Sequence, residues 1–374
     1  MFPLLLRTLL SRSRVDVLWV RSRRDQQLEG AFDGFDIVIY DPSRKYLSLV
    51  ALRALRWIVK RNESRQTSKH WLLLRILRPK VVVTGDGYQG LRDLYNLLKD
   101  SKLLVIAHGL YLEQSGSSLI REHLPDAIPA ELTLFSIGEY DRVHYRRWGL
   151  IPSTVVPIGT ITNSEYSIVS SRSKPKMVRS FDLCIVEKGI SLSPADEFES
   201  WIHWNWKTFL ELLSGVCKKR SELRIAVCLS GSNRQKVAER AEWFQQFFSS
   251  KLTFTWQGDD KWGSYKFIDQ SNLTIGVCST SLAEALARRK KILSFNMTSH
   301  SIWNFPGDGI HRLLQPTEAD LSDRIELLLD MSTEDYFRHL PIETRSVCSL
   351  PPEGALALIR SSISSELFAN GVTQ

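Results

Sequence analysis

The chain lacks the features that mark a membrane-spanning, disulfide-bonded or metal-binding protein. No apolar run in its 374 residues approaches the ~20 residues that a transmembrane helix needs. Its five cysteines are scattered, odd in number and without a CxxC pair, which argues against a disulfide framework and a structural zinc site. The eight histidines form no i, i+4 pair and no HxH cluster. We therefore expect a reducing compartment and no metal centre.

Basic residues are concentrated near the N-terminus. The whole chain carries a net charge of +8, but residues 1–80 hold 17 Lys and Arg against 7 Asp and Glu. The remainder is therefore slightly acidic. Such a segment fits an anionic membrane surface, an acidic substrate or RNA. A nucleic-acid binder usually spreads its basic face further, so we expect no nucleic-acid partner.

Length and composition indicate a globular protein of about two domains. Hydrophobic residues make up 43% and charged residues 24%, values that exclude a disordered chain. Short β-rich runs alternate with helical stretches, which predicts βαβ units and parallel sheets. We expect a first Rossmann-like domain over 1–165, a Ser- and Lys/Arg-rich linker over 166–180, and a second Rossmann-like domain over 181–374. The last helix is also able to pack back on the first domain.

The expected strands set the framework for the functional residues. In the first domain they are Arg14–Val20, Phe35–Tyr40, Lys80–Thr84, Lys102–Ala107, Leu132–Ile137 and Val155–Ile158. In the second they are Phe181–Val186, Leu223–Leu229, Leu252–Trp256, Leu273–Val277 and Lys291–Phe295. Ligands of such α/β sheets bind at the carboxyl ends of the strands, here in a cleft between the two domains.

The strongest local signal is the segment CSTSLAEAL, residues 278–286, directly after a predicted strand. Ser279, Thr280 and Ser281 place small hydroxyl residues at a strand-to-helix turn, where free backbone N–H groups and the helix dipole favour a phosphate. Glu284, one turn later, can accept hydrogen bonds from ribose hydroxyls. The alternative is that Ser281 and Glu284 form a capping box, which only satisfies helix N–H groups.

Three further segments of the second half are weaker candidates. Lys188 and Gly189 follow the first strand, where a lysine can neutralise a phosphate, although a solvated turn charge is an equal alternative. Ser230 also follows a strand and can lie against a nucleotide base or phosphate, with a turn role slightly favoured. Trp303 is a weak cleft candidate, and the basic run 288–291 is expected to be a solvated helix end.

The order of segments in the second half of the chain resembles the donor half of the GT-B glycosyltransferases. The strand, the Ser/Thr-rich turn, the residues Glu-Ala-Leu, a basic pair and the strand KILSF look similar to the surface-polysaccharide and CDP-glycerol glycerophosphotransferase-like branch. In the first half, residues 135–160 (FSIGEYD, Tyr145, WG and VPIGT) resemble the segment where GT-B chains leave the acceptor domain. The resemblance spans roughly residues 14–330 and implies two Rossmann-like domains facing a central cleft.

A candidate base follows the strand KLLVI. His108 stands there beside Gly109, and a histidine titrates near neutral pH, so it can deprotonate an attacking hydroxyl. The glycerophosphotransferase-like branch has a similar strand-His-Gly element whose histidine acts as a base, and the resemblance implies this role for His108. Asp86 and Glu113 are competing bases on loops at the same sheet edge.

Two absences refine the implied chemistry. Residues 85–90 read as GxGxxG, but the following strand ends without a carboxylate, so a dinucleotide site is not expected. There is also no Asp-x-Asp tripeptide and no Walker GK[ST] motif. We therefore expect neither a metal-bound donor nor a cofactor beyond the nucleotide-activated co-substrate.

The resemblance implies a glycosyltransferase. It would move a sugar, or a related polyol phosphate, from a nucleotide-activated donor to a hydroxyl of a glycan or lipid-linked glycan acceptor in surface polysaccharide biosynthesis. The expected location is cytoplasmic, with residues 1–80 attaching peripherally to the inner face of the membrane. The alternatives are a nucleotide-sugar epimerase of the same fold and a non-catalytic sugar-nucleotide-binding or assembly module.

Overall fold

The computed structural model describes most of the second half of the chain and parts of the first. The described residues are 17–20, 37–40, 79–85, 95–96, 101–107, 128–140, 150–173, 179–195, 197–231, 233–256 and 258–369. Two compact units emerge: residues 1–109, 117–164 and 350–374 form the first, and residues 110–116 and 165–349 form the second. None of the helices in the described part combines the length and apolar character needed to cross a bilayer.

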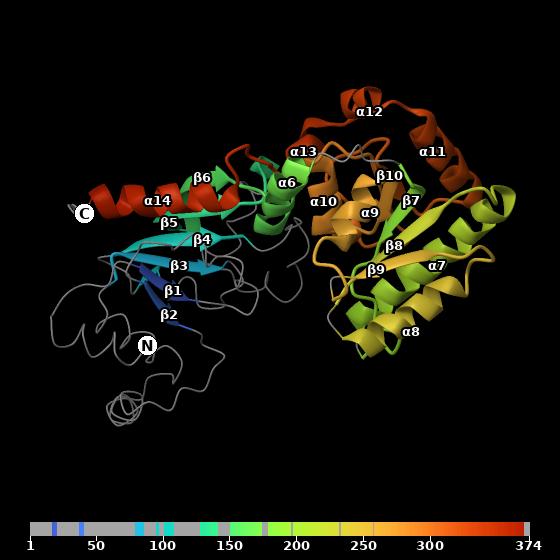
Figure 1. Cartoon of the computed structure of the whole chain (residues 1–374), viewed down its shortest axis with the longest axis horizontal. Helices are drawn as coiled ribbons and strands as arrows, with labels where there is room; N and C mark the ends of the chain where they lie inside the picture. Colours follow the sequence, from blue (N-terminus) through green and yellow to red (C-terminus); the bar gives the residue numbers. More distant parts are fainter. Residues whose placement is uncertain are drawn as a thin grey trace. The chain divides into compact units, whose positions relative to one another are not determined.

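The first unit contains one parallel sheet with the order β2-β1-β3-β4-β5-β6 (Figure 1). Its strands are β1 Val17–Val20, β2 Ile37–Tyr40, β3 Val81–Gly85, β4 Lys102–Ile106, β5 Ile128–Ser136 and β6 Leu150–Pro157. All residues of β3 are buried, which is typical of a parallel sheet covered on both faces and explains the uninterrupted VVV run. Each strand overlaps one expected from the sequence.

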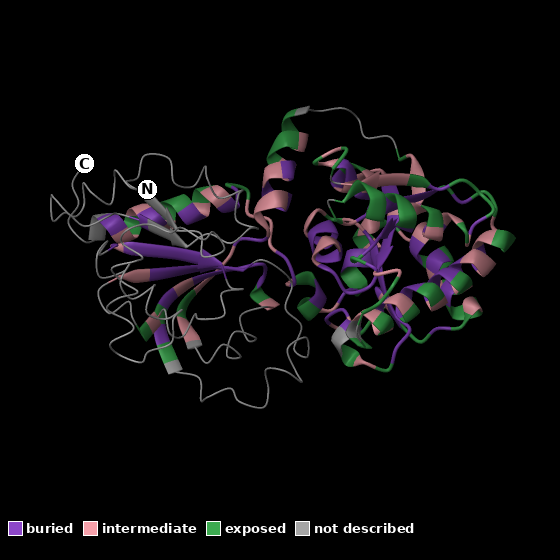
Figure 2. Ribbon diagram, turned by 90° about the horizontal axis from the view of Figure 1, so that it is seen from below, coloured by how far each residue is buried: buried purple, intermediate pink, exposed green. Residues whose placement is uncertain are grey.

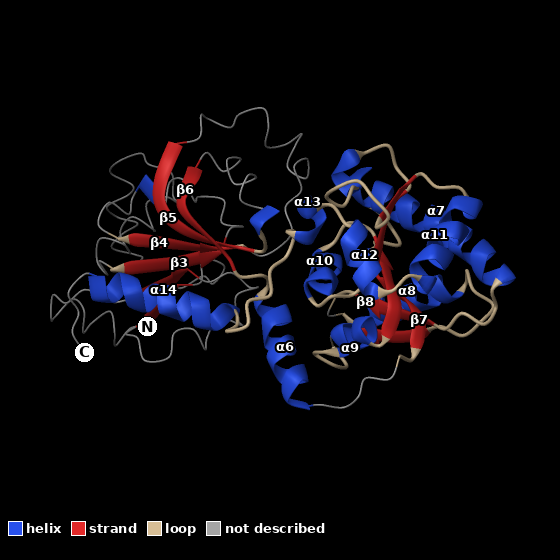
Figure 3. Ribbon diagram, turned by 90° about the horizontal axis from the view of Figure 1, so that it is seen from above, coloured by secondary structure: helices blue, strands red, loops and turns tan. Residues whose placement is uncertain are grey.

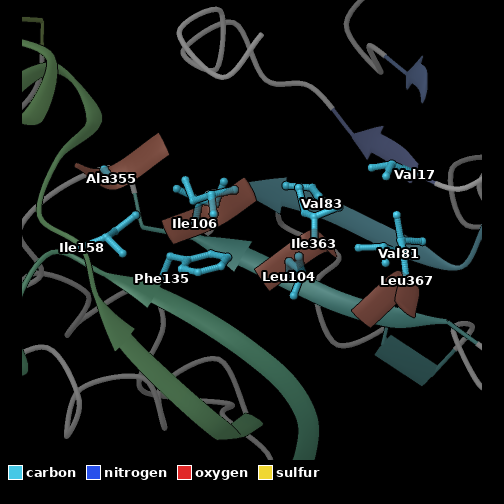
Figure 4. Close-up of a cluster of buried hydrophobic side chains, with 11 residues drawn as sticks. Val17, Val81, Val83, Leu104, Ile106, Phe135, Ile158, Ala355, Ile363 and Leu367 are labelled. Atoms are coloured by element: carbon cyan, nitrogen blue, oxygen red, sulfur yellow. The ribbon is translucent and has the colours of Figure 1, made fainter. Parts of the chain in front are cut away.

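Helix α14, Ala355–Ala369, completes the core of the first unit (Figure 4). Four of its residues, spaced four apart, lie in one buried cluster with side chains of the sheet; they are Ala355, Ile359, Ile363 and Leu367. The N–H of Ala355 also donates to Ser164 Oγ at 2.8 Å. The last helix thus belongs to the first unit, and the expected second domain of 181–374 ends earlier, near Ser349.

The second unit contains a separate parallel sheet with the order β12-β11-β10-β7-β8-β9. Its strands are β7 Phe181–Val186, β8 Ile225–Leu229, β9 Thr253–Trp256, β10 Ser271–Gly276, β11 Ile292–Asn296 and β12 Arg312–Leu314. The described strands therefore form two distinct parallel sheets, and the expected fold of two α/β domains is confirmed. Figure 3 shows the helices that surround the second sheet.

The helices of the second unit pack an aromatic core against the sheet. They are α7 Glu197–Lys219, α8 Arg234–Gln245, α9 Gly263–Asp269, α10 Thr280–Ala287, α11 Glu318–Asp330, α12 Thr333–His339 and α13 Ile342–Arg345, with a 3₁₀ turn, η5, over Ser301–Trp303. Phe209 of α7 stacks on Phe295 of β11 with ring centroids 3.6 Å apart, and Trp206 meets the same ring edge-on at 5.1 Å. Figure 2 shows this buried interior. The middle of α7 is thereby anchored to β11.

The segment expected as a linker is partly helical. Helix α6 spans Ile161–Ser173, and its residues Asn163, Ser164 and Tyr166 are buried. Tyr166 stacks on Tyr265 of α9 with ring centroids 5.0 Å apart. Because the buried positions are mostly polar or small, the helix has no apolar stripe, and the sequence shows no helical period there.

Candidate functional site

Three strands of the second sheet end side by side and bring the predicted segments together. β10 pairs with β7, and β7 pairs with β8, all in parallel (Figure 1). Residues 187–189, 230–231 and 277–281 follow these strands and share one edge of the sheet. The carboxyl edge of a parallel α/β sheet is where such folds bind ligands. This edge of the second unit is the candidate site.

Lys188 reaches the start of helix α10. Its Nζ donates a hydrogen bond to the Cys278 carbonyl oxygen at 3.1 Å, although the two residues are 90 positions apart in the chain. Cys278 immediately precedes Ser279, the residue that caps the helix. The full charge of the ammonium group therefore adds to the partial positive charge of the helix N-terminus. Two groups that attract a phosphate lie at one place.

The Lys188 ammonium group is partly shielded from water. Its Nζ lies 5.1 Å from the ring centroid of Trp303, a buried residue, within the range of a cation–π contact. The surrounding protein desolvates the ammonium group and lowers the pKa of Lys188 below its usual value. The residue as a whole remains exposed. For an anion that contacts this cation, the attraction is stronger than in bulk water.

Helix α10 begins before the position that a capping box at Ser281 would require. Ser279 has an extended backbone, and its Oγ accepts the N–H of the residue three positions on at 3.3 Å. The capping box suggested for Ser281 and Glu284 is therefore wrong, because Ser279 occupies the N-cap. Thr280 and Ser281 form the first turn, and both are half-buried. The hydroxyl-rich turn retains the position predicted for a phosphate.

Glu284 is buried beside Tyr265 of α9. Burial holds the pKa of the Tyr265 hydroxyl well above its usual range, and the neighbouring Glu284 carboxylate is the next largest cause. Arg288, one turn further along α10, pairs with Asp269 at 3.1 Å, and its guanidinium group lies 4.7 Å from the Tyr265 ring centroid. Glu284 thus has neighbours inside the fold. Its role as a ribose ligand stays a prediction.

Arg288, Lys290 and Lys291 of the basic run after α10 have partners inside the fold, so this helix end is not solvated throughout as expected, and only Arg289 of the run is exposed. Besides the buried pair of Arg288 and Asp269, Lys290 Nζ donates to the Asp269 carbonyl oxygen at 3.1 Å. Lys291 is also buried, and its Nζ donates to the Met331 carbonyl oxygen at 2.6 Å, at the end of α11. These cations satisfy carbonyl groups that the helix end leaves without partners.

A buried ion pair supports the turns after β7 and β8. Glu187 is fully buried and accepts hydrogen bonds from Arg240 Nη1 at 3.1 Å, from Ser230 N at 2.8 Å and from Ser230 Oγ at 2.7 Å. Ser230 Oγ in turn accepts the Gly189 N–H at 2.8 Å. Gly189 has a positive φ of 50°, which favours glycine. Ser230 therefore serves the turn, and neither Glu187 nor Arg240 stood out in the sequence.

The predicted catalytic residues lie outside the described residues. They are His108, Asp86 and Glu113, and their roles stay predictions. Among the residues that the structure does describe, no group of three or more His, Cys, Asp or Glu side chains could hold a metal ion.

One aromatic pair of the second unit was not expected. Trp201, near the start of α7, stacks on His300 in the loop after β11 with ring centroids 4.0 Å apart and planes 28° apart. The only hint in the sequence was the aromatic run WIHW over 201–204. This run does not follow a predicted strand, so there was no reason in the sequence to place it at a binding site.

Comparison with known protein families gives one partial match. A family described as "putative O-antigen biosynthesis protein" matches residues 145–309, which is less than half of the chain. A search of curated proteins found no match.

Solved structures with similar folds cover nearly the whole chain. A Listeria monocytogenes protein described as a "putative UDP-N-acetylglucosamine 2-epimerase" is 12% identical, with a TM-score of 0.56, covering 97% of this chain and 99% of its own. The Methanocaldococcus jannaschii UDP-GlcNAc 2-epimerase is 11% identical, with a TM-score of 0.53, covering 94% and 100%. A Rickettsia africae glycosyltransferase is 11% identical over 96% and 97%, and at its TM-score of 0.44 we draw nothing from it. The likenesses to the Listeria and Methanocaldococcus structures show that the chain has the GT-B fold of two Rossmann-like domains.

Proposed function

We propose that this protein is a glycosyltransferase of surface polysaccharide biosynthesis. It moves a sugar, or a related polyol phosphate, from a nucleotide-activated donor to a hydroxyl of a glycan or lipid-linked glycan. The observation that carries the proposal is the contact of Lys188 with Cys278 at the start of α10. It gathers a cation, a helix N-terminus and the hydroxyl-rich turn on the edge where α/β folds bind nucleotides.

The reaction divides between the two units. The donor diphosphate binds at Ser279, Thr280 and Ser281, with Lys188 and Gly189 beside it. Glu284 receives the ribose, and His108 of the first unit deprotonates the acceptor hydroxyl, with Asp86 and Glu113 as competing bases. Lys188 and the helix dipole stabilise the leaving phosphate, so the proposed mechanism uses no metal ion.

A binding screen of UDP-, GDP-, CMP- and CDP-activated donors tests this proposal, with the free nucleotides and nucleosides as references. Lys188→Met should weaken binding of the preferred nucleotide by about 1–3 kcal/mol and leave binding of its nucleoside unchanged, because only the phosphate contact is lost.

Glu284→Gln should weaken binding of the nucleotide and of the nucleoside alike by about 1–3 kcal/mol, because both carry the ribose. Isothermal titration calorimetry measures both.

Lys207→Met is the matched control for charge, since Lys207 lies exposed on α7. No binding of any nucleotide by the wild-type chain would contradict the proposal. Unchanged affinity with a lowered melting temperature in Glu284→Gln would assign that carboxylate to the support of Tyr265.

An epimerase acting on a nucleotide sugar is the second candidate. It is favoured by the fold likeness to two proteins described as UDP-GlcNAc 2-epimerases, one of them solved with UDP-GlcNAc and UDP. The two reactions differ in their need for an acceptor. Conversion of the sugar, followed by NMR in the absence of any acceptor, would favour the epimerase, whereas acceptor-dependent release of the nucleotide would favour the transferase. Binding without either reaction would identify a sugar-nucleotide-binding module.

The basic segment 1–80 is proposed to attach the protein peripherally to an anionic membrane, on its cytoplasmic face. Surface attraction is worth about 1 kcal/mol per basic residue near the lipid. We therefore expect the protein to sediment with phosphatidylserine vesicles at low salt and to be released at high salt, because exposed charges are screened. Equal recovery in the supernatant with neutral and anionic vesicles would contradict this attachment.

A further inference from the structure

The stacked pair of Trp201 and His300 is connected to the proposed phosphate site through contacts within the second unit. The link runs through η5. The backbone N–H of Trp303 donates to the His300 carbonyl oxygen at 3.2 Å, and the Trp303 ring lies against the Lys188 ammonium group. All of these residues belong to the second unit. His300 thus lies about one helical turn before Trp303, the residue whose ring contacts the Lys188 ammonium group.

The loop that carries His300 is held in place before any ligand arrives. Asn296 at the end of β11 donates through Nδ2 to the His300 carbonyl oxygen at 2.9 Å and to Asn304 Oδ1 at 2.7 Å. Its Oδ1 accepts the Thr298 N–H at 2.9 Å, and Thr298 Oγ1 accepts the His300 N–H at 3.1 Å. These hydrogen bonds fix the backbone at His300, and its ring stacks on the indole of Trp201. A loop that is ordered in advance lowers the cost of binding a ligand.

The helix that carries Trp201 is anchored to the same strand end. Asn205 of α7 is fully buried, and its Oδ1 accepts the Met297 N–H at 2.7 Å, directly after β11. Trp201 and Trp204 lie about one helical turn apart on α7. Trp204 is 50% exposed and makes no ring contact among the described residues, whereas Trp201 is half-buried and stacked.

His300 keeps its polar edge available. The ring is half-buried, and within the described part of the chain no group forms a hydrogen bond with either ring nitrogen. A neutral imidazole offers one donor and one acceptor. An aromatic face beside an open donor and acceptor suits a pyranose ring, which presents C–H groups on one face and hydroxyl groups around its edge.

We infer that Trp201 and His300 form the subsite for the sugar of the nucleotide-activated donor. The indole and imidazole rings present the apolar surface, and the His300 nitrogens hydrogen-bond sugar hydroxyls next to the phosphate held by Lys188. The inference rests on the proposed function, because it takes the turn at Ser279 as the phosphate site.

The test compares one nucleotide sugar with the same nucleotide lacking its sugar. The probes are UDP-GlcNAc and UDP, together with the tightest pair from the donor screen. Trp201→Ala and His300→Ala should each weaken the nucleotide sugar about tenfold, which corresponds to about 1.4 kcal/mol, and leave the free nucleotide unchanged. Trp204→Ala is the matched control and should change neither affinity. If Trp201→Ala fails to fold by circular dichroism, His300→Ala carries the test.

Equal affinity of the variants and the wild-type chain for the nucleotide sugar would overturn the inference. So would an equal loss for sugar-free and sugar-bearing nucleotides, or an equal effect of Trp204→Ala. Loss of binding only for an acceptor glycan presented without nucleotide would place the acceptor, not the donor sugar, on the pair and would also overturn it. If the wild-type chain binds no nucleotide, the proposed function itself fails, and the inference fails with it.

Discussion

Replacing His108 with alanine is expected to lower turnover by about 10²–10⁴-fold, the usual contribution of a positioned general base. A sugar hydroxyl is a poor nucleophile at neutral pH. In the sequence His108 comes shortly after the end of β4, and α/β folds bind ligands at the carboxyl ends of their parallel strands. The affinity for the nucleotide should not change, because the proposed donor site lies on the second unit. Steady-state kinetics with an identified donor and acceptor, together with calorimetry, would measure both effects.

Asp86→Asn and Glu113→Gln serve as the competing variants. Full turnover in His108→Ala with loss of turnover in either of the others would reassign the base and leave the donor site as proposed. If all three variants retain wild-type turnover, the catalytic half of the proposal is wrong. The protein would then be better described as a sugar-nucleotide-binding module on a transferase fold.

Removing one partner of the buried pair Glu187–Arg240 is expected to destabilise the second unit by about 3–5 kcal/mol. The exposed fraction is 8% for the Arg240 side chain and 0% for the Glu187 side chain, so either single replacement leaves a charge without its counter-ion in the interior. Total stabilities of domains are about 5–15 kcal/mol, so this loss is large. Glu187→Ala and Arg240→Ala should therefore each lower the unfolding midpoint markedly in a thermal or urea titration.

The same variants should also weaken nucleotide binding. Glu187 accepts hydrogen bonds from Ser230, and Ser230 holds Gly189, so the turn that presents Lys188 loses its support. A double replacement, Glu187→Leu with Arg240→Met, should cost less than the sum of the single losses, since no unpaired charge remains.

Disruption of the exposed pair Lys207–Glu211 is the control, because both side chains are 54% exposed. Lys207→Ala should cost only about 0.3–0.5 kcal/mol. Additive losses in the double replacement at Glu187 and Arg240 would contradict the proposed coupling.

The sequence was informative where the signal is local. Lys188 and Ser279 could each be placed after a strand, because runs such as FDLCIV and LTIGV and the turns that follow them are contiguous. That Lys188 contacts the residue before Ser279 depends on β7 lying next to β10, and strand order is not written in either segment. The stack of Trp201 on His300 depends on the same kind of long-range packing.

The burial of charged side chains was the other feature that the sequence did not predict. A run of four basic residues after a helix is usually solvated. Only the tertiary structure supplies Asp269 and the end of α11 as partners for Arg288, Lys290 and Lys291. Two elements of secondary structure were also not predicted. β12 has only three residues, too few to show a strand pattern in the sequence, and it is recognised as a strand by its pairing with β11. Helix α6 has no apolar period, because its buried positions are largely polar.

The return of α14 to the first unit has a consequence for biosynthesis. The last strand of the first sheet ends at Pro157, yet the helix that closes its core begins at Ala355, after the whole second unit. At about 5–20 residues per second, a ribosome needs about 10–40 s to add the intervening chain. During that interval the nascent sheet exposes the apolar face that α14 later covers, and the second unit can fold first, even though it is made second.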